Sequence, residues 1–287
     1  MFTIVHLAPS SMQHLESAVN LDHAAGVVAV SVELSCNETG SGPPVVILHG
    51  LFGSKRNFSA IARRLAAAFR VFTVDLRNHG ESPWDDRHDY PALAEDVAGL
   101  IERRAGPPAA VIGHSMGGKA AMLLALSRPE LVERLVVVDI PPARSRGTPI
   151  SYVQAMQAVP LARLSRRAEV EAALAADISD PVVRGFLVTN IVSRPEGLAW
   201  TVNLEVIERQ FETILGWPEL PPEKQYAGPT LFVTGAHSTF VKPEHEAVIH
   251  QLFPLARIEV IPGAGHWVHA EQPEAFLNAV GRFLDQP

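Results

Sequence analysis

The chain has 287 residues, enough for one large α/β domain or for one domain with an insertion. Its 47% hydrophobic and 19% charged residues exclude a disordered chain, and the net charge of −7 argues against a nucleic-acid-binding surface. The single cysteine, Cys36, cannot form an internal disulfide, no signal peptide is evident, and no apolar run reaches the ~18 residues of a membrane-spanning helix. We therefore expect a cytoplasmic protein with no nucleic-acid partner and no membrane contact, and the oligomeric state stays open.

Residues 1–25 show no clear hydrophobic period and are interpreted as an N-terminal extension of unknown role. Beyond them, apolar runs of strand type alternate with helical stretches as far as residue 142. The predicted strands span residues 27–34, 45–48, 71–74, 109–112 and 135–138, and the predicted helices span residues 57–68, 91–104 and the stretch after Ser115. Residues 36–44 have the composition of a turn. The alternation predicts a mostly parallel central sheet with helices on both faces.

The alternation stops between residues 143 and 217, where we expect only helices. These helices span residues 151–159, 166–176, 181–190 and 201–215. Because an insertion at this point leaves the carboxyl edge of the sheet, it is predicted to lie over that edge as a helical lid. The sheet is expected to resume with strands 230–234 and 257–261 and helices 243–252 and 273–284. Residues 26–142 and 218–287 are thus predicted to form the core, and residues 143–217 the lid.

The segment Gly113-His114-Ser115-Met116-Gly117 separates a predicted strand from a predicted helix. A sharp strand-to-helix turn leaves no room for a Cβ beside its apex, which favours glycine at positions 113 and 117. Ser115 at the apex would point outward at the start of a helix, where unpaired N–H groups and the helix dipole favour negative charge. The pattern is typical of a nucleophile elbow, and its alternative is a serine in an ordinary strand-to-helix turn.

A serine nucleophile needs a general base, and His266 is the favoured one of twelve histidines. It follows the last predicted strand on a glycine-rich loop, at the same sheet edge as Ser115. Four other histidines in or near motifs are expected to pack or to bond the backbone, namely His49, His79, His114 and His269.

The base in turn needs a carboxylate that fixes its tautomer. The turn after the predicted strand 230–234, where this acid usually lies, contains no Asp or Glu. Asp139 ends a neighbouring predicted strand at the same edge, so its carboxylate can approach His266, and we assign it as the acid. Two alternatives stay open: Asp139 caps the proline turn that follows it, or Glu244 is the acid.

The tetrahedral intermediate of acyl transfer needs N–H donors for its oxyanion. In this arrangement one donor is the Met116 N–H, and the other is the N–H of Leu51 or Phe52 in the loop after the second predicted strand. Lys119, one helical turn past the predicted nucleophile, is interpreted as a solvent-facing or turn-bonding residue. No cluster of residues has the spacing of metal ligands, so we expect no metal and no cofactor.

Five blocks of sequence carry a family resemblance: His49–Ser54, Asp75–Pro83, Gly113–Lys119, Val138–Pro142 and Gly263–Glu271. In this order they resemble the bacterial YbfF-type esterases and their relatives, the abhydrolase-domain-11 proteins. The resemblance covers about Val45 to the C-terminus, although the predicted lid matches only at Trp200, Asn203 and Gly216-Trp217. It implies a lidded α/β-hydrolase fold acting on carboxylic esters or thioesters, with Ser115 as nucleophile, His266 as base and Asp139 as acid. An acid at this early strand is a trait of that family.

We therefore expect a serine hydrolase that cleaves small-molecule carboxylic esters, or thioesters, through an acyl-enzyme intermediate. A second hypothesis uses the same triad for carbon–carbon bond hydrolysis or a lyase reaction on a small acidic metabolite, with Arg144, Arg146 and Arg163 supplying a basic pocket. A third, a ligand-binding protein on a hydrolase fold, is disfavoured because nucleophile, base and acid are all present. The apolar pocket lining is expected from the lid residues Met156, Phe186, Trp200 and Phe211.

Overall fold

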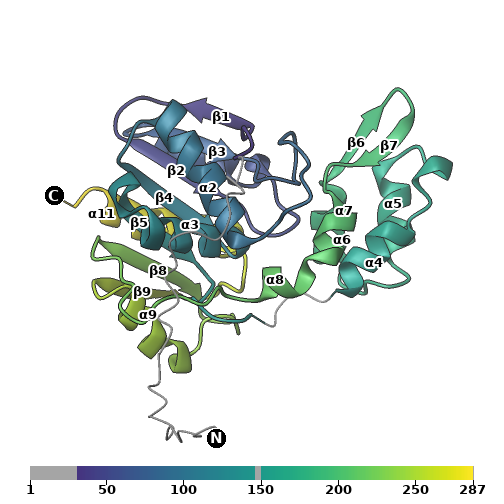
Figure 1. Cartoon of the computed structure of the whole chain (residues 1–287). Helices are drawn as coiled ribbons and strands as arrows, with labels where there is room; N and C mark the ends of the chain where they lie inside the picture. Colours follow the sequence, from purple (N-terminus) through teal and green to yellow (C-terminus); the bar gives the residue numbers. More distant parts are fainter. Residues whose placement is uncertain (1–30, 146–149, 287) are drawn as a thin grey trace, which may run out of the picture. The chain divides into compact units, whose positions relative to one another are not determined.

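The structure is a computed structural model that describes residues 31–145 and 150–286 (Figure 1). The predicted extension at residues 1–25 lies outside this part of the chain, as does Arg146. Among the residues described, none of the helices combines the length and the apolar character that crossing a bilayer requires.

A seven-stranded sheet forms the centre of the fold (Figure 1). Its strands, in spatial order, are β1 (Cys36–Thr39), β3 (Arg70–Val74), β2 (Pro44–Leu48), β4 (Ala109–His114), β5 (Val132–Val138), β8 (Thr230–Gly235) and β9 (Ala256–Ile261). β1 pairs antiparallel with β3, and the other neighbouring strands are parallel. The middle strands are almost wholly buried and apolar, as a sheet covered on both faces requires. The expected mostly parallel sheet is confirmed.

Helices cover both faces of this sheet, and each face has its own hydrophobic cluster. On one face lie α2 (Tyr90–Leu100), α3 (Met116–Ser127) and α9 (Glu246–Leu252), and on the other lie α1 (Ser59–Leu65) and α11 (Pro273–Leu284), preceded by the short α10 (Val268–Glu271). β2 has β3 on one side and β4 on the other, so the chain changes direction across the sheet there. Open α/β sheets form a crevice at the carboxyl ends of strands at such a point.

The first strand of the described part lies later than the sequence predicts. The pattern predicts a strand over residues 27–34, but residues 31–35 pair with no strand and residues 27–30 are outside the described part. β1 instead takes up the first residues of the expected turn. Its polar side chains are tolerated because it is an edge strand, and its pairing comes from the backbone of β3. The turn begins at Gly40, whose φ is 80°.

Residues 150–217 form an insert between β5 and β8. Its helices are α4 (Ser151–Ala158), α5 (Arg167–Leu174), α6 (Pro181–Val188), α7 (Leu204–Arg209) and α8 (Phe211–Leu215). The expectation of helices alone needs correction, because β6 (Ile191–Arg194) and β7 (Gly197–Trp200) form an antiparallel hairpin. β7 begins at Gly197, whose φ is 127°, and both strands are too short for periodicity to reveal them.

Lys119 ties the insert to the core. Its side chain is fully buried and donates to the carbonyl oxygens of Leu215 at 2.9 Å and Gly216 at 2.6 Å. The backbone N–H of Ser145 also donates to the Leu215 carbonyl at 2.8 Å, so both ends of the insert meet near this lysine. Burial and the neighbouring Arg144 guanidinium lower the pKa of Lys119 to about 7. Lys119 therefore bonds the backbone, which is one of its two expected roles, and does not face solvent.

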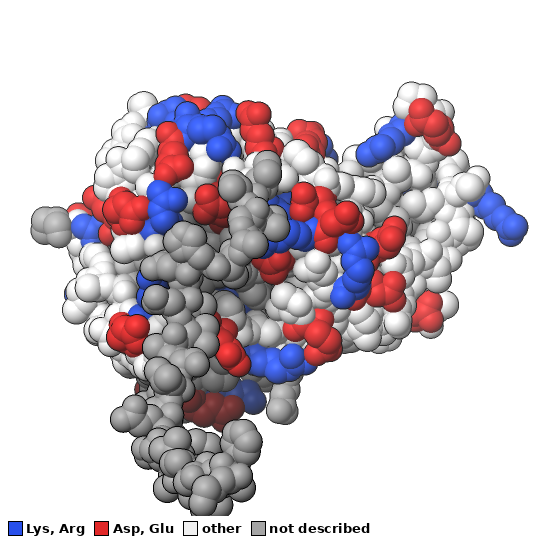
Figure 2. Space-filling view, in the orientation of Figure 1, with Lys and Arg blue, Asp and Glu red and all other residues white. Residues whose placement is uncertain are grey.

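Charges of both signs are mixed on the face shown in Figure 2. Lys and Arg side chains stand beside Asp and Glu there. Exposed ion pairs of the protein include Arg70–Glu38 and Arg128–Glu102. Much of the surface of the insert, at the right of this view, shows neither basic nor acidic side chains. Among the residues coloured there, no continuous basic patch is formed.

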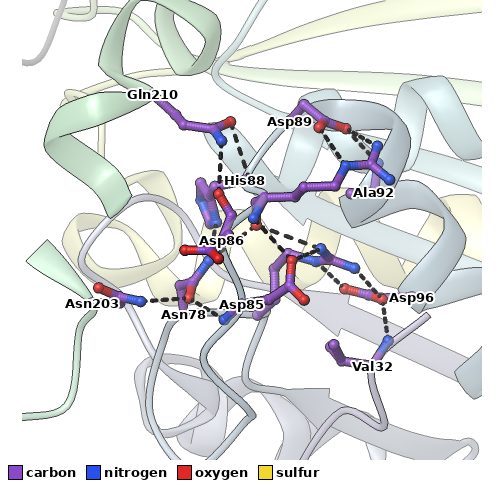
Figure 3. Close-up of polar contacts among 12 residues, drawn as sticks. Val32, Asn78, Asp85, Asp86, His88, Asp89, Ala92, Asp96, Asn203 and Gln210 are labelled. Atoms are coloured by element: carbon purple, nitrogen blue, oxygen red, sulfur yellow. Dashed lines mark hydrogen bonds and ion pairs between the residues drawn. The ribbon is translucent and has the colours of Figure 1, made fainter. Parts of the chain in front are cut away.

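A buried ion pair fixes the loop between β3 and α2, the region drawn in Figure 3. Nε and Nη2 of Arg77 donate to the two carboxylate oxygens of Asp96 at 2.6 and 2.7 Å, and neither side chain is more than 2% exposed. Asp96 also accepts the Val32 N–H at 2.7 Å, and Arg77 pairs with Asp85 at 2.9 Å. The loop is thereby held against α2 by charges that have little access to water.

We predict that Asp96→Asn lowers the free energy of unfolding by about 3–5 kcal/mol, because it removes the fully buried carboxylate that pairs with Arg77 and leaves that guanidinium only the partly exposed Asp85. Urea denaturation followed by circular dichroism measures the change. The matched control is Glu274→Gln, which breaks an Arg–carboxylate pair whose side chains are 58% and 68% exposed and should leave stability nearly unchanged. Equal losses in the two variants would contradict the account.

Candidate active site

Ser115 stands between β4 and α3 in a backbone conformation that few residues adopt, with φ 52° and ψ −119°. A Cβ at Gly113 would lie 2.3 Å from the Gly117 carbonyl oxygen, and a Cβ at Gly117 would lie 2.5 Å from the His49 carbonyl oxygen. Only glycine fits either position. Such a bend costs about 1–3 kcal/mol and persists only where the surroundings impose it. The predicted nucleophile thus sits at the apex of a tight bend, directly before the first turn of a helix.

His266 and Asp139 come from the ends of different strands and meet directly. Nδ1 of His266 lies 2.7 Å from Oδ2 of Asp139, and the Asp139 side chain is fully buried while that of His266 is 21% exposed. A carboxylate only accepts hydrogen bonds, so Nδ1 carries the proton and donates, which leaves the lone pair of a neutral ring on Nε2. The structure thus brings the predicted base and acid into contact.

Further donors surround the Asp139 carboxylate. Oδ1 accepts from the Thr234 hydroxyl at 2.6 Å and from the Gly235 N–H at 3.4 Å, and Oδ2 accepts from the Ser238 hydroxyl at 2.5 Å. These groups belong to the end of β8 and its turn, the usual location of the acid itself. The sequence shows that no carboxylate is present there, and the Thr234 and Ser238 hydroxyls are the signal in the sequence that this place holds an acid from the neighbouring strand.

The ring of His266 is enclosed on two sides. Phe240 stacks on it with ring centres 3.8 Å apart and planes 12° apart, and the His114 ring lies 4.7 Å away. Nε2 of His114 also bonds the His266 carbonyl oxygen at 2.9 Å. The sequence did not reveal the contact with Phe240.

Glu244, the rival acid, is exposed and lies 3.9 Å from the Lys242 ammonium.

The loop after β2 approaches Ser115 closely, since a Cβ on Gly50 would lie 3.1 Å from the Ser115 Cβ. The Gly53 N–H donates to the Gly50 carbonyl at 2.9 Å and closes a turn in which Phe52 has a φ of 59°. The Phe52 N–H donates to Nε2 of His79 at 3.3 Å. Of the two N–H groups that the sequence offers as oxyanion donors in this loop, one is therefore engaged by a buried histidine.

Ser115 and His266 line the same pocket, which has a volume of about 430 Å³. Core and insert both contribute apolar side chains to it, among them Leu51, Phe52, Phe58, Tyr152, Val183, Phe186 and Leu187. Most ligand pockets are apolar with a few polar groups that orient the ligand, and this one has that character. An apolar group next to Ser115 would be well accommodated.

Of the four residues predicted to line the pocket, Phe186 does so. Met156, Phe211 and Trp200 instead pack in the hydrophobic cluster, where Trp200 Nε1 donates to the Met156 carbonyl at 3.1 Å. Apolar character alone therefore does not separate residues that line the pocket from residues that pack in this cluster. Arg144 pairs with Glu212, and neither Arg144 nor the exposed Arg163 is among the residues lining this pocket.

Residues 43–273 match the family described as alpha/beta hydrolase fold. The sn-1-specific diacylglycerol lipase ABHD11 of Xenopus laevis is 44% identical over 272 residues, which cover 92% of this chain and 86% of the frog protein. Esterase YbfF of Escherichia coli (strain K12) is 36% identical over 243 residues, which cover 84% of this chain and 93% of the esterase. The solved structure of a marine microorganism esterase has a TM-score of 0.85 and 34% identity, covering 88% of this chain and 100% of the other. The resemblance seen in the sequence is confirmed.

Two buried histidines make the stability of this region depend on pH. Burial lowers the pKa of His49 to about 4 and, with the neighbouring His49, that of His79 to about 3. Each ring donates from Nδ1 to a carbonyl and accepts a backbone N–H at Nε2, so both are neutral. Below about pH 6.5 these two histidines are protonated in the unfolded chain but stay neutral in the folded protein. The free energy of unfolding therefore falls as pH falls.

We predict that this decrease amounts to about 1.4 kcal/mol per pH unit for each such histidine between about pH 6 and pH 5. His79→Gln should reduce the slope of the free energy of unfolding against pH by about the contribution of one histidine. The reason is that the amide can make both hydrogen bonds but does not titrate in this range. Urea denaturation at several pH values compares the two proteins. If the free energy of unfolding changes with pH equally in the variant and the wild type, the assignment of His79 as a neutral buried histidine is contradicted.

Proposed function

The chain belongs to the α/β-hydrolase fold family, and from this premise we propose that it is a carboxylic ester hydrolase in which Ser115 is the nucleophile, His266 the general base and Asp139 the acid behind it. One observation carries the proposal: His266 Nδ1 bonds the buried Asp139 carboxylate at 2.7 Å, beside a pocket that Ser115 also lines. A histidine held in this way has its second nitrogen available for a proton from a serine hydroxyl.

The reaction has two halves. In the first, Ser115 Oγ attacks the ester carbonyl carbon while His266 Nε2 takes the hydroxyl proton, and the proton then passes to the departing alcohol, leaving an acyl-enzyme. In the second, His266 takes a proton from water, whose oxygen attacks the acyl carbon, and returns it to Ser115 Oγ as the carboxylic acid leaves. Asp139 stabilises the imidazolium that forms in each half.

Backbone N–H groups of Leu51 and Met116 are the oxyanion donors of this proposal. Met116 is the first residue of α3, where N–H groups have no partner within the helix. Leu51 is preferred to Phe52 because the Phe52 N–H is already bonded to His79. Removal of one oxyanion donor typically lowers kcat by about 10²- to 10³-fold.

The apolar pocket supports a small ester with an apolar acyl group as the substrate. The relatives reported above are named a diacylglycerol lipase and esterases, which agrees with that class. Because the insert contributes Tyr152, Val183, Phe186 and Leu187 to the lining, we propose that residues 143–217 act as a lid over the pocket. Whether the protein also cleaves thioesters is tested by comparing its rates of hydrolysis of an oxygen ester and a thioester that carry the same acyl group. The cytoplasmic location stays a prediction.

We predict that Ser115→Ala and His266→Ala each lower kcat for a short-chain p-nitrophenyl ester by about 10⁶-fold. The reason is that hydroxyl and imidazole act as one unit, so loss of either removes the acyl-enzyme route. Release of p-nitrophenolate measures the rate, and circular dichroism checks the fold. A variant within tenfold of the wild type would exclude the mechanism, whereas a wild type inactive on every ester would favour the alternative reaction on a small acidic metabolite.

We also predict that Asp139→Asn lowers kcat by about 10⁴-fold, since an amide cannot both hold the correct tautomer and stabilise the imidazolium. Glu244→Gln is the matched control, because it neutralises the exposed rival carboxylate in the same way. It should retain the wild-type rate in the same p-nitrophenyl ester assay. If the two variants rank in the opposite order, the acid is Glu244.

A further inference from the structure

Asn190 carries a hydrogen bond from the insert to the loop after β2. It lies between α6 and β6, is 2% exposed, and its Nδ2 donates to the Phe52 carbonyl oxygen at 2.7 Å. The same Nδ2 donates to the Leu187 carbonyl at 3.1 Å, and the Asn190 carbonyl accepts the Thr201 N–H at 2.8 Å. The side chain is therefore fixed by its own segment while it binds the core.

This bond completes a set that fixes three consecutive peptide units. The carbonyl of Gly50 accepts from His49 Nδ1 at 2.8 Å and from the Gly53 N–H at 2.9 Å, which fixes the unit containing the Leu51 N–H. The next unit donates its N–H, that of Phe52, to His79. The third unit accepts at its carbonyl from Asn190. Because each unit is planar and trans, the N–H of the first unit must face away from the group that holds its carbonyl.

The loop needs such restraint because Phe52 has a φ of 59°, a region that residues with a Cβ avoid. If the Phe52 carbonyl lost its donor, the strained residue could relax toward negative φ. That rotation would turn the neighbouring peptide units, including the one that carries the Leu51 N–H. A hydrogen bond at the carbonyl of the strained residue opposes this rotation directly.

We propose that Asn190 is a positioning residue for the oxyanion-binding loop, so that the insert completes the catalytic centre as well as lining its pocket. The proposal rests on the proposed function, in which the Leu51 N–H binds the oxyanion. Asn190 does not touch the reacting atoms in this account. It acts through the Phe52 peptide, and its effect is therefore expected in the chemical step and not in the binding of the substrate.

Other contacts hold the insert to the core without touching the strained loop. Nδ2 of Asn203 donates to Oδ1 of Asn78 at 3.1 Å, and Gln210 bonds the Asp86 carbonyl and the His88 N–H, as Figure 3 shows. These bonds keep the insert seated when Asn190 is changed. They also offer a matched control, because Asn203 is an asparagine of the insert that bonds the core at a different loop.

We expect Asn190→Ala to lower kcat and kcat/KM for a short-chain p-nitrophenyl ester by about 10- to 100-fold with KM within about twofold of the wild type. Inhibition by a trifluoromethyl ketone, whose adduct carries the oxyanion, should weaken by the same factor as kcat/KM. Asn203→Ala should change kcat by less than about threefold, although it also removes an insert-to-core hydrogen bond. A merely structural role for Asn190 would make the two variants alike.

Asn190→Asp keeps the shape of the side chain, and circular dichroism checks that this variant folds. Its carboxylate cannot donate to the Phe52 carbonyl, whereas its protonated form can. The ratio of its kcat to that of the wild type should therefore rise as pH is lowered from about 9 to about 6, and Asn190→Ala should show no such rise.

The outcomes separate this inference from the proposed function. If Ser115→Ala is inactive while Asn190→Ala keeps the wild-type kcat, or raises KM alone, the positioning role is wrong and the mechanism stands. If Ser115→Ala retains activity, the mechanism itself fails. Reduced kcat with matching loss of inhibitor affinity, together with the pH-dependent recovery of Asn190→Asp, supports the inference.

Discussion

The hydrogen bond between His266 and Asp139 is the interaction on which the proposed chemistry depends. A fully buried carboxylate is unfavourable unless several donors satisfy it, and here the end of β8 supplies Thr234, Gly235 and Ser238 in addition to the imidazole. Because these donors are fixed by β8 and the turn after it, the carboxylate has little freedom to move. The histidine is thus oriented by a group that is itself held from several sides.

The parallel sheet explains why this edge can hold such an arrangement. Ser115, Asp139 and Phe52 follow β4, β5 and β2, and their φ values are 52°, 53° and 59°. Each strained residue is anchored through its own N–H: that of Ser115 to Val138 at 3.0 Å, that of Asp139 to Val233 at 2.9 Å, and that of Phe52 to His79. Bonds between neighbouring chain segments therefore oppose the relaxation of all three bends, and the carboxyl edge of the sheet is pre-organised.

The sequence was informative wherever function depends on a local pattern. The bend at Ser115, the carboxylate at a strand end in Asp139 and the glycine-rich loop of His266 could be predicted because strand, turn and helix signals surround them. Contacts made across the fold could not be predicted. The burial of Lys119 depends on the end of α8, far along the chain, and the role of Asn190 depends on where the insert meets the core.

The central claim is that His266 activates Ser115 as a nucleophile, and covalent labelling tests it most directly. A fluorophosphonate reacts with a serine only when a neighbouring base has activated its hydroxyl. After reaction of the whole protein, intact mass and peptide mapping should locate one adduct, on Ser115, and His266→Ala should prevent its formation. An adduct at a different residue, or undiminished labelling of the His266→Ala variant, would contradict the account.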